Sequence, residues 1–470
     1  MPLIFPSNTL SAGGFSVDNS CRFNEGSSDY LQRTPGGASD RKTWTLSCWI
    51  KRGSLGSDDM ILSQGTTSGS LAYIYFNTED RLGIAFDTEA SGNFRTDMLF
   101  RDISAWYHIV IACDTTESTE GDRVKTYVNG SQVTYSTESQ PAEDYETQFN
   151  TTTSMDIGRK GSGSGNPFDG YMAEYFFIDG QALTPTSFGE FDEDSPTIWK
   201  PKNVSGLTFG TNGFYLDFED SADLGADVSG NSNDFTVNNL TSVDQTTDTP
   251  TNNFCTMNPI TMSSLAALAE GNLKVLAASA SDNGNTQITF APQVGKWYFE
   301  CKLTIDSATY PRIGIAPIES VGRLLNANDG LIGVITGSAA QYANGDKYIS
   351  GAQTADYGES YSTGDIMGIA LDFDNGAFYT SKNNAWQGSS DPESGASKTN
   401  ALFTWTAGAE EYIAGVTTYS TSSAAEMNFG GCQSFTISSG NADADGYGNF
   451  EYAPPSGYYA LCTKNLAEYG

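Results

Sequence analysis

The strongest constraint on the fold of this chain is a repeated pattern of short runs in which apolar and polar residues alternate, with turn residues between them. RKTWTLSCWIKR covers residues 41–52, AWYHIVIACD covers 105–114, and GDIMGIALDFD covers 364–374. Alternation of this kind is typical of β-strands that bury one face. Glycine is common between the runs, and long runs with helical periodicity are nearly absent. The pattern predicts an all-β chain built from antiparallel sheets.

The alternating runs also predict which side chains enter the core. The residues that share an apolar face are Trp44, Leu46, Cys48 and Ile50 in the first run, and Tyr107, Ile109, Ile111 and Cys113 in the second. The seven cysteines are odd in number and contain no CxxC pair, and several fall within such runs. We therefore expect small buried apolar residues rather than a disulfide or zinc framework, consistent with assembly in a reducing cytosol.

Local sequence predicts two turns and indicates one short helical stretch. Asn129-Gly130 separates two alternating runs, and Asp374-Asn375-Gly376 separates two more. Both are typical hairpin signals, and for Asp374-Asn375-Gly376 we expect a type I′ turn, in which both central residues have positive φ. SSLAALAEG at 263–271 has helical character, but it is too short to form a stable helix alone.

The distribution of these runs divides the chain into four segments. Residues 1–20 form a short arm, and strand-like runs recur over 21–190. Residues 191–259 differ in sequence pattern, because turn-rich runs surround the few possible strands. They are predicted to be an irregular connector, packed at its start and loop-like near its end. Alternation returns over 260–470. We therefore predict two antiparallel β-sandwich domains joined by the connector.

The charge of the chain argues against two classes of partner. With 24 basic and 57 acidic residues, the net charge is −33, which repels phosphate backbones and anionic lipid surfaces. No apolar run approaches the length of about 18 residues that spans a bilayer. The start MPLIFPSNTL does not resemble a signal peptide. We expect no nucleic-acid binding, no membrane insertion, and release by a route other than ordinary secretion.

Few residues qualify as catalytic candidates. Glu190, Asp192 and Asp194 alternate in EFDEDSP, but Ser-Pro follows them and no apolar strand surrounds them, so a solvated acidic loop is the preferred interpretation. His108 is the single histidine, and its place inside a strand run indicates a structural ring rather than a member of a catalytic triad. We therefore predict no catalytic site.

One acidic stretch has partial calcium-loop character. NADADGYGNFEY places Asn441, Asp443 and Asp445 at alternating positions before a glycine, but Glu451 stands one position earlier than a calcium loop requires. A Ca²⁺ site is one interpretation, and a polar turn is the other. A second, weaker acidic cluster consists of Asp217, Glu219, Asp220, Asp223 and Asp227.

Two groups of motifs resemble known domain families. RFNEGSSDYLQRT, TWTLSCWIKR, AWYHIVIACDTT, VKTYVNG and MDIGRKGSGSGNPFDGYMAEYFFIDGQALTPTSF resemble a concanavalin A-like sandwich of laminin-G type, in the order such modules use. GKWYFECKL, PRIGIA, GDIMGIALDFDNGAFYTSKN and MNFGG resemble a SPRY domain. The resemblance implies jelly-roll or concanavalin-like sandwiches for both domains.

The end of the chain and the connector resemble segments of structural proteins from marine tailed phages. These are GYGNFEYAPPSGYYALCTKNL and FYLDFEDSADLGADVSGNSNDFTVNNL. In such proteins a laminin-G-like and a SPRY-like module often share one chain. The resemblance implies a virion protein, assembled in the host cytoplasm and released by lysis, in a tail fibre, a receptor-binding appendage or a head-surface fibre.

The function implied by this resemblance is non-enzymatic recognition or adhesion at the particle surface. The implied partners are other virion proteins and a host surface glycan or protein, and such appendages are usually symmetric oligomers, often trimers. A polysaccharide depolymerase is an alternative, because the concanavalin-like fold includes glucanases. A head or neck decoration protein that makes structural interfaces is another.

The resemblance also suggests contact residues, because SPRY domains bind partners through loops at one end of the sandwich. Asn383, Asn384 and Trp386 follow a predicted hairpin, and Tyr342 and Tyr348 lie in QYANGDKYIS. Aromatic rings offer rigid apolar faces to sugars and proteins alike. These five residues are the predicted ligand-binding residues, although Trp386 in particular also fits a role in covering the sheet edge.

Overall fold

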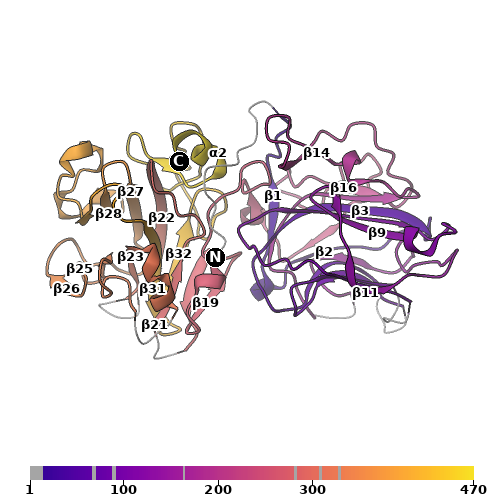
Figure 1. The fold of residues 1–470 in the computed structure, drawn as a ribbon, viewed down its shortest axis with the longest axis horizontal. Helices are drawn as coiled ribbons and strands as arrows, with labels where there is room; N and C mark the ends of the chain where they lie inside the picture. Colours follow the sequence, from indigo (N-terminus) through magenta and orange to yellow (C-terminus); the bar gives the residue numbers. More distant parts are fainter. Residues whose placement is uncertain are drawn as a thin grey trace. The chain divides into compact units, whose positions relative to one another are not determined.

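The computed structural model describes residues 14–65, 70–86, 91–161, 165–279, 283–305, 310–325 and 330–470. The chain forms two compact units that divide between Thr251 and Asn252 (Figure 1). Nearly all regular structure is β, as predicted. Most of the predicted arm at 1–20 lies outside the described residues. Within the described ranges, no helix is long and apolar enough to cross a membrane.

The first unit contains two large antiparallel sheets. One runs in the order β10 (Ser131–Gln132), β9 (Val124–Val128), β8 (Tyr107–Asp114), β3 (Thr43–Arg52), β13 (Gly170–Asp179), β1 (Ser20–Phe23) and β18 (Gln245–Thr246), with β16 (Phe214–Leu216) beside β13. The other runs in the order β11 (Tyr135–Ser139), β7 (Ser91–Thr96), β6 (Leu82–Phe86), β5 (Ala72–Phe76), β4 (Asp59–Gln64), β12 (Met155–Ile157), β2 (Tyr30–Arg33) and β17 (Thr236–Asn238). A separate hairpin joins β14 (Gly189–Phe191) and β15 (Trp199–Pro201).

The core of the first unit confirms the predicted apolar faces of β3 and β8. All eight residues assigned to those faces belong to one buried cluster. Trp44 lies within it, stacked 5.8 Å from Phe177 and edge-on to Phe149 at 4.9 Å. All seven cysteines of the chain are buried, as expected.

The segment predicted as a connector, 191–259, packs into the first unit for most of its length. It contributes β15, β16, β17 and β18, each only two or three residues long. These strands are too short to show alternation in the sequence, but their neighbourhood supplies core residues, namely Phe214, Leu216, Leu224, Phe235 and Leu240. The structure therefore has no separate connector domain between the two units.

The second unit also contains two sheets. One runs β19 (Ala266–Ala269), β20 (Lys274–Ala277), β32 (Ala424–Asn428), β22 (Lys296–Thr304), β27 (Ile366–Asp372), β28 (Ala377–Lys382) and β29 (Ala385–Trp386), with β30 (Phe403–Thr404) beside β28 and β33 (Tyr459–Ala460) beside β22. The other runs β21 (Asn283–Gln287), β31 (Tyr412–Tyr419), β23 (Arg312–Pro317), β24 (Ala339–Gln341), β25 (Lys347–Ile349) and β26 (Ala352–Thr354). The described residues of this unit also form two short α-helices, α1 (Val321–Leu324) and α2 (Thr463–Tyr469).

A weak helical signal in the second unit gives way to a strand, and one local prediction there is wrong. SSLAALAEG contains the strand β19, because pairing with β20 outweighs the helical propensity of its alanine and leucine residues. Asp374-Asn375-Gly376 is not a type I′ turn. The strands pair at Asp372 and Ala377, so the loop has four residues, and within it only Gly376 has positive φ.

Type I′ geometry occurs elsewhere. Asn129 and Gly130 have φ of 47° and 79° between paired Val128 and Ser131, which confirms the predicted hairpin. A second such turn lies at Asn383 and Asn384, with φ of 47° and 70°, between β28 and β29. The number of residues between the last paired positions therefore decides the turn type, rather than the Asn-Gly dipeptide alone.

In each unit the first and last segments lie side by side. In the first unit, β1 pairs with β18, and the Val17 amide donates to the Thr251 hydroxyl at 3.0 Å. In the second unit, Phe254 and Cys462 form an antiparallel bridge, and the Thr463 amide donates to the Asn253 carbonyl at 2.9 Å. Each unit is thus closed by contacts between its own two ends.

Candidate functional site

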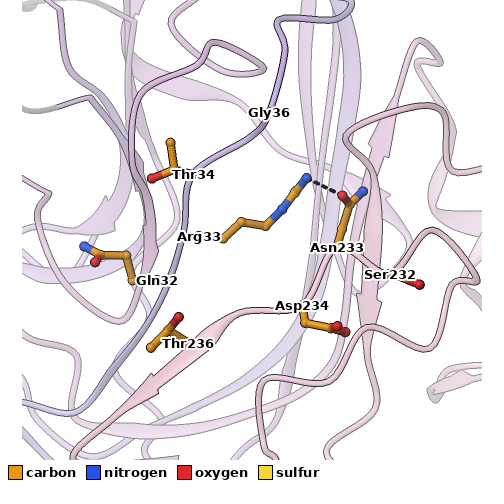
Figure 2. Close-up of a pocket in the computed structure, with 8 residues that line it drawn as sticks. All are labelled: Gln32, Arg33, Thr34, Gly36, Ser232, Asn233, Asp234 and Thr236. Carbon is orange, nitrogen blue, oxygen red and sulfur yellow. Dashed lines mark hydrogen bonds between the residues drawn. The ribbon is translucent and has the colours of Figure 1, made fainter.

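The first unit contains a polar hollow of about 350 Å³ at the edge where β2 meets β17 (Figure 2). One side comes from the end of β2 and the residues after it, and the other from the segment that leads into β17. The lining residues are Gln32, Arg33, Thr34, Gly36, Ser232, Asn233, Asp234 and Thr236. The pairing of Thr236 with Gln32 holds the two sides together.

Arg33 extends across the hollow towards Asn233 (Figure 2). Its guanidinium group donates to the Asn212 carbonyl at 2.9 Å and to the Asn233 side-chain oxygen. Burial lowers the pKa of Arg33, while Asp227, Asp179 and Asp234 act in the opposite direction. The guanidinium is therefore anchored by hydrogen bonds to the Asn212 carbonyl and the Asn233 side chain.

A dense hydrogen-bonded turn shapes the side of the hollow formed by 227–234. The Asp227 carboxylate accepts four hydrogen bonds, from the amides of Tyr215, Ser229 and Asn233 and from the Ser229 hydroxyl. Asn231 and Asn233 both donate to the Gly213 carbonyl. Asp227, which the sequence placed in a weak acidic cluster, thus orders this turn by accepting N–H and O–H groups.

The chemistry of the hollow suits a ligand with many hydroxyl groups. Hydroxyls, amides, a guanidinium and a carboxylate offer both donors and acceptors at short range. Asp234 supplies the only carboxylate among the eight lining residues, and its Oδ1 already accepts the Asp227 amide at 2.9 Å. Sequence reasoning missed this site, because its sides lie some 200 positions apart in the chain. The Asp/Ser/Asn-rich run DVSGNSND was the available signal.

Two of the predicted contact residues contact each other in the second unit. Tyr342 is buried and stacks on half-buried Tyr348, with ring centroids 3.8 Å apart. On its other side the Arg312 guanidinium lies 4.1 Å from the Tyr342 ring and 4.2 Å from the Tyr310 ring. Tyr342 is therefore an inner member of a cation–ring stack, and Tyr348 stands at its end.

The other predicted contact residues belong to the other sheet of that unit. Asn383 and Asn384 are exposed at the β28–β29 turn. Asn383 also braces the strand beside it, since its side chain accepts from the Ile366 amide at 2.9 Å and donates to Asp365 at 2.7 Å. Trp386 is half-buried against the cluster that contains Tyr298 and Tyr379, consistent with covering the sheet edge.

The predicted calcium loop is organised round a buried Asp443. Its Oδ1 accepts from the amides of Asp445 and Tyr447, and its Oδ2 accepts from the Ala460 amide and the Asn465 side chain, all at 2.7–3.0 Å. Asn441 forms a bridge with Phe450. In the part of the chain that the structure describes, no group of three or more His, Cys, Asp or Glu side chains is placed to hold a metal ion.

His108 is a structural residue, as the sequence indicated. Its Nδ1 accepts the indole N–H of Trp199 at 2.8 Å, so the ring carries its proton on Nε2, which lies 2.9 Å from the Ser47 hydroxyl. The ring stacks on Trp49 with centroids 4.8 Å apart. Burial lowers the pKa of His108 to about 3, which keeps the imidazole neutral.

The acidic loop EFDEDSP differs from its prediction at one residue. Glu190 and Asp194 are exposed, but Asp192 is buried and forms an ion pair with Lys200 at 3.1 Å. The expectation of a wholly solvated loop is therefore wrong for Asp192. The β14–β15 hairpin brings Lys200 over it, because Glu190 pairs with Lys200 across the two strands.

One protein-family model matches part of the first unit. Residues 25–187 match the model of the concanavalin A-like lectin/glucanase superfamily, laminin-G type. No curated protein matches the sequence. Among solved structures, the SPRY domain of human HERC1 is 13% identical with a TM-score of 0.29, covering 38% of this chain and 97% of its own.

Two other solved structures show similar levels of likeness. A native heptameric SAP-like pentraxin from Limulus polyphemus is 16% identical with a TM-score of 0.29, over 36% of this chain and 78% of its own. A putative carbohydrate binding protein from Bacteroides ovatus ATCC 8483 is 18% identical with a TM-score of 0.32, over 48% of this chain and 59% of its own. Residues 25–187 therefore match a concanavalin A-like module of laminin-G type. SPRY domains are among the solved structures similar to this chain.

Proposed function

We propose that this protein is a non-catalytic binding protein of a phage particle, and that its first unit holds a hydroxyl-rich glycan in the polar hollow between β2 and β17. The observation that carries the proposal is the lining of that hollow. Arg33 is fixed across it, and hydroxyl and amide groups surround the guanidinium. Such an arrangement pairs sugar hydroxyls without reacting with them.

The same lining favours binding over hydrolysis. Glycosidases need two carboxyl groups, about 5–5.5 Å apart in retaining enzymes and about 6.5–9.5 Å apart in inverting ones. The hollow has one, Asp234. The superfamily model that matches residues 25–187 covers both lectins and glucanases, so the fold alone does not distinguish binding from hydrolysis. The side chains of the site are what distinguish the two functions.

The phage setting rests on the sequence resemblance of the connector and the final segment to virion proteins. In that setting the protein is an exposed fibre or appendage component that recognises a receptor on the host surface. A symmetric oligomer raises a modest affinity at each hollow to a strong overall attachment, because several sites engage one surface together.

Binding of purified bacterial surface polysaccharides and their fragments to the full chain tests the hollow. We expect Asp234→Ala and Thr34→Val to weaken binding at least tenfold. Asp220→Ala removes a similar exposed carboxylate of the first unit outside the hollow, and we expect it to bind as the unaltered protein does. Equal binding by all three variants would contradict the proposed site.

Two further measurements separate the alternatives. New reducing ends after incubation with these polysaccharides would identify a depolymerase and contradict a non-catalytic role. Antibody labelling of intact particles, imaged by electron microscopy, is expected to mark a tail fibre or another exposed appendage. Labelling confined to the head or neck would instead support a decoration protein, and its absence from particles would refute the virion assignment.

A further inference from the structure

A second small cavity, of about 260 Å³, lies in the second unit where four segments meet. They are the start of β22, the loop between β27 and β28, the strand β33 and the end of α2. The lining residues are Gly295, Lys296, Asp374, Gly457, Tyr459 and Tyr469. Since pockets for drug-sized ligands measure about 300–1,000 Å³, this one fits a ligand of about one sugar ring.

The backbone holds these segments together in a defined way. β33 lies parallel to β22, with Trp297 opposite Tyr459. Gly295 donates its amide to Asp374 Oδ1 at 2.7 Å, and its carbonyl accepts the Phe373 amide at 3.0 Å. Gly295 has a φ of 82°, and a Cβ there would lie 2.5 Å from the Tyr469 carbonyl oxygen. Glycine at this position therefore allows the end of α2 to close the cavity.

The aromatic part of the lining is a preformed platform. The rings of Tyr459 and Tyr469 stack with centroids 3.7 Å apart and planes 10° apart, and both residues are half-buried. Hydrogen bonds of Tyr469 to Tyr459 and Asp445 raise the pKa of Tyr469, so its hydroxyl stays protonated. Rigid tyrosine rings of this kind bind a flat apolar face at low cost in conformational entropy.

The polar part of the lining carries one charge of each sign. Lys296 Nζ lies 3.4 Å from Asp372, and Asp374 is exposed. Asp374 Oδ1 is occupied by Gly295, while its Oδ2 has no hydrogen bond to the described residues. A cation and an anion in one small cavity favour a neutral ligand that both donates and accepts hydrogen bonds. A neutral pyranose has such hydroxyls together with an apolar ring face.

We infer that this cavity is a saccharide site of the second unit, which binds a single neutral pyranose against the Tyr459–Tyr469 platform with its hydroxyls on Asp374 and Lys296. The site does not depend on the hollow of the first unit, because the two are built from different residues. The chain would then carry two glycan sites of different character, one polar and one aromatic.

Titration of the full chain with methyl glycosides of glucose, galactose, mannose and N-acetylglucosamine, followed by calorimetry and saturation-transfer NMR, tests this inference. We expect saturable binding of at least one glycoside that Tyr469→Ala weakens at least tenfold. Tyr469→Phe keeps the ring and should retain most of the binding. Tyr452→Ala alters another half-buried tyrosine of the same unit and should have no effect.

The outcomes separate this site from the first-unit hollow. Binding reduced by Tyr469→Ala and Asp374→Ala but not by Asp234→Ala supports the inference. Binding that depends on Asp234 and is unchanged in Tyr469→Ala overturns it while leaving the hollow intact. The absence of saturable binding for all four glycosides overturns it as well.

Discussion

The two units bury their carboxylates with different partners. In the first unit several buried carboxylates pair with cations: Lys51 lies 2.7 Å from Asp248, and Arg52 lies 3.0 Å from Asp59 and 3.1 Å from Asp80. In the second unit the partners are mainly N–H groups. Glu300 accepts the amides of residues 451 and 452 at 2.9 and 2.8 Å, and Asp443 accepts four N–H donors.

The difference shows that buried carboxylates have two structural roles in this chain. A cation–carboxylate pair joins side chains from distant elements, as Lys51 of β3 and Asp248 near the end of the first unit do. A carboxylate that accepts backbone amides fixes a local path of the chain, as Asp443 does for the segment before α2. Loss of the cation from a pair of the first kind leaves a buried charged carboxylate. Loss of the carboxylate from an interaction of the second kind leaves buried N–H groups without an acceptor.

The largest expected effect comes from removing a cation in the first unit. Lys51→Met removes the buried cation that lies 2.7 Å from the buried Asp248 carboxylate, which should lower the free energy of unfolding by about 3–5 kcal/mol. Urea unfolding of the full chain, followed through its first-unit transition, measures this loss. Lys42→Met breaks an exposed pair with Asp144 and should cost less than about 1 kcal/mol. Equal losses in both variants would refute the distinction.

A smaller effect is expected from removing an acceptor in the second unit. Asp443→Ala leaves buried N–H groups of Ala460 and Asn465 without an acceptor, so we expect a loss of about 2–3 kcal/mol. Hydrogen exchange should accelerate first around residues 460–466. Glu468→Ala removes an exposed carboxylate of α2 outside this loop and serves as the control. A Ca²⁺-dependent rise in Tm that Asp443→Ala abolishes would contradict the N–H-bound assignment and identify a metal site instead.

The smallest expected effect is a pH dependence of the first unit. Burial raises the pKa of Glu174 to about 8, that of Asp169 to about 7 and that of Asp59 to about 6. Each carboxyl then keeps its proton in the folded state at pH values where the unfolded chain has lost it. The free energy of unfolding therefore falls as pH rises from the ordinary pKa of the unfolded chain towards the raised pKa of the folded state.

For Glu174 the fall between pH 7 and pH 8 should be about 1 kcal/mol. Urea unfolding over this range measures it, and Glu174→Gln, which cannot ionise, should flatten the curve. Glu174 hydrogen-bonds the Tyr215 hydroxyl and faces the charges of Asp217 and Glu219. A first unit that gains stability from pH 7 to pH 8 would contradict the raised pKa.

Much of the fold was predictable because it depends on local alternation. The faces of β3 and β8 and the Asn129-Gly130 turn follow from residues within a few positions of each other. Elements that depend on distant partners were not predictable in this way. β19 forms through its pairing with β20, and β16 to β18 pair with strands that precede them by as many as 226 positions, as Ser20 and Thr246 do.

The candidate sites were harder to predict for the same reason. Tyr342 and Asp443 looked like contact and metal residues from their neighbours in the sequence, yet their environments are set by Arg312 and by Ala460 and Asn465. Asp192 was expected to be solvated, but the β14–β15 hairpin places Lys200 beside it. The two cavities gather residues from segments that no sequence window contains together.

The closure of each unit by its own ends has an evolutionary consequence. When the first and last residues of a domain lie close together, the domain can be inserted into a surface loop of another protein. Neither a long linker nor a disrupted sheet is then needed. The pairing of β1 with β18 and the bridge between Phe254 and Cys462 give both units this property. Recombination at these adjacent ends could therefore replace one unit while the sheets of the other stay intact.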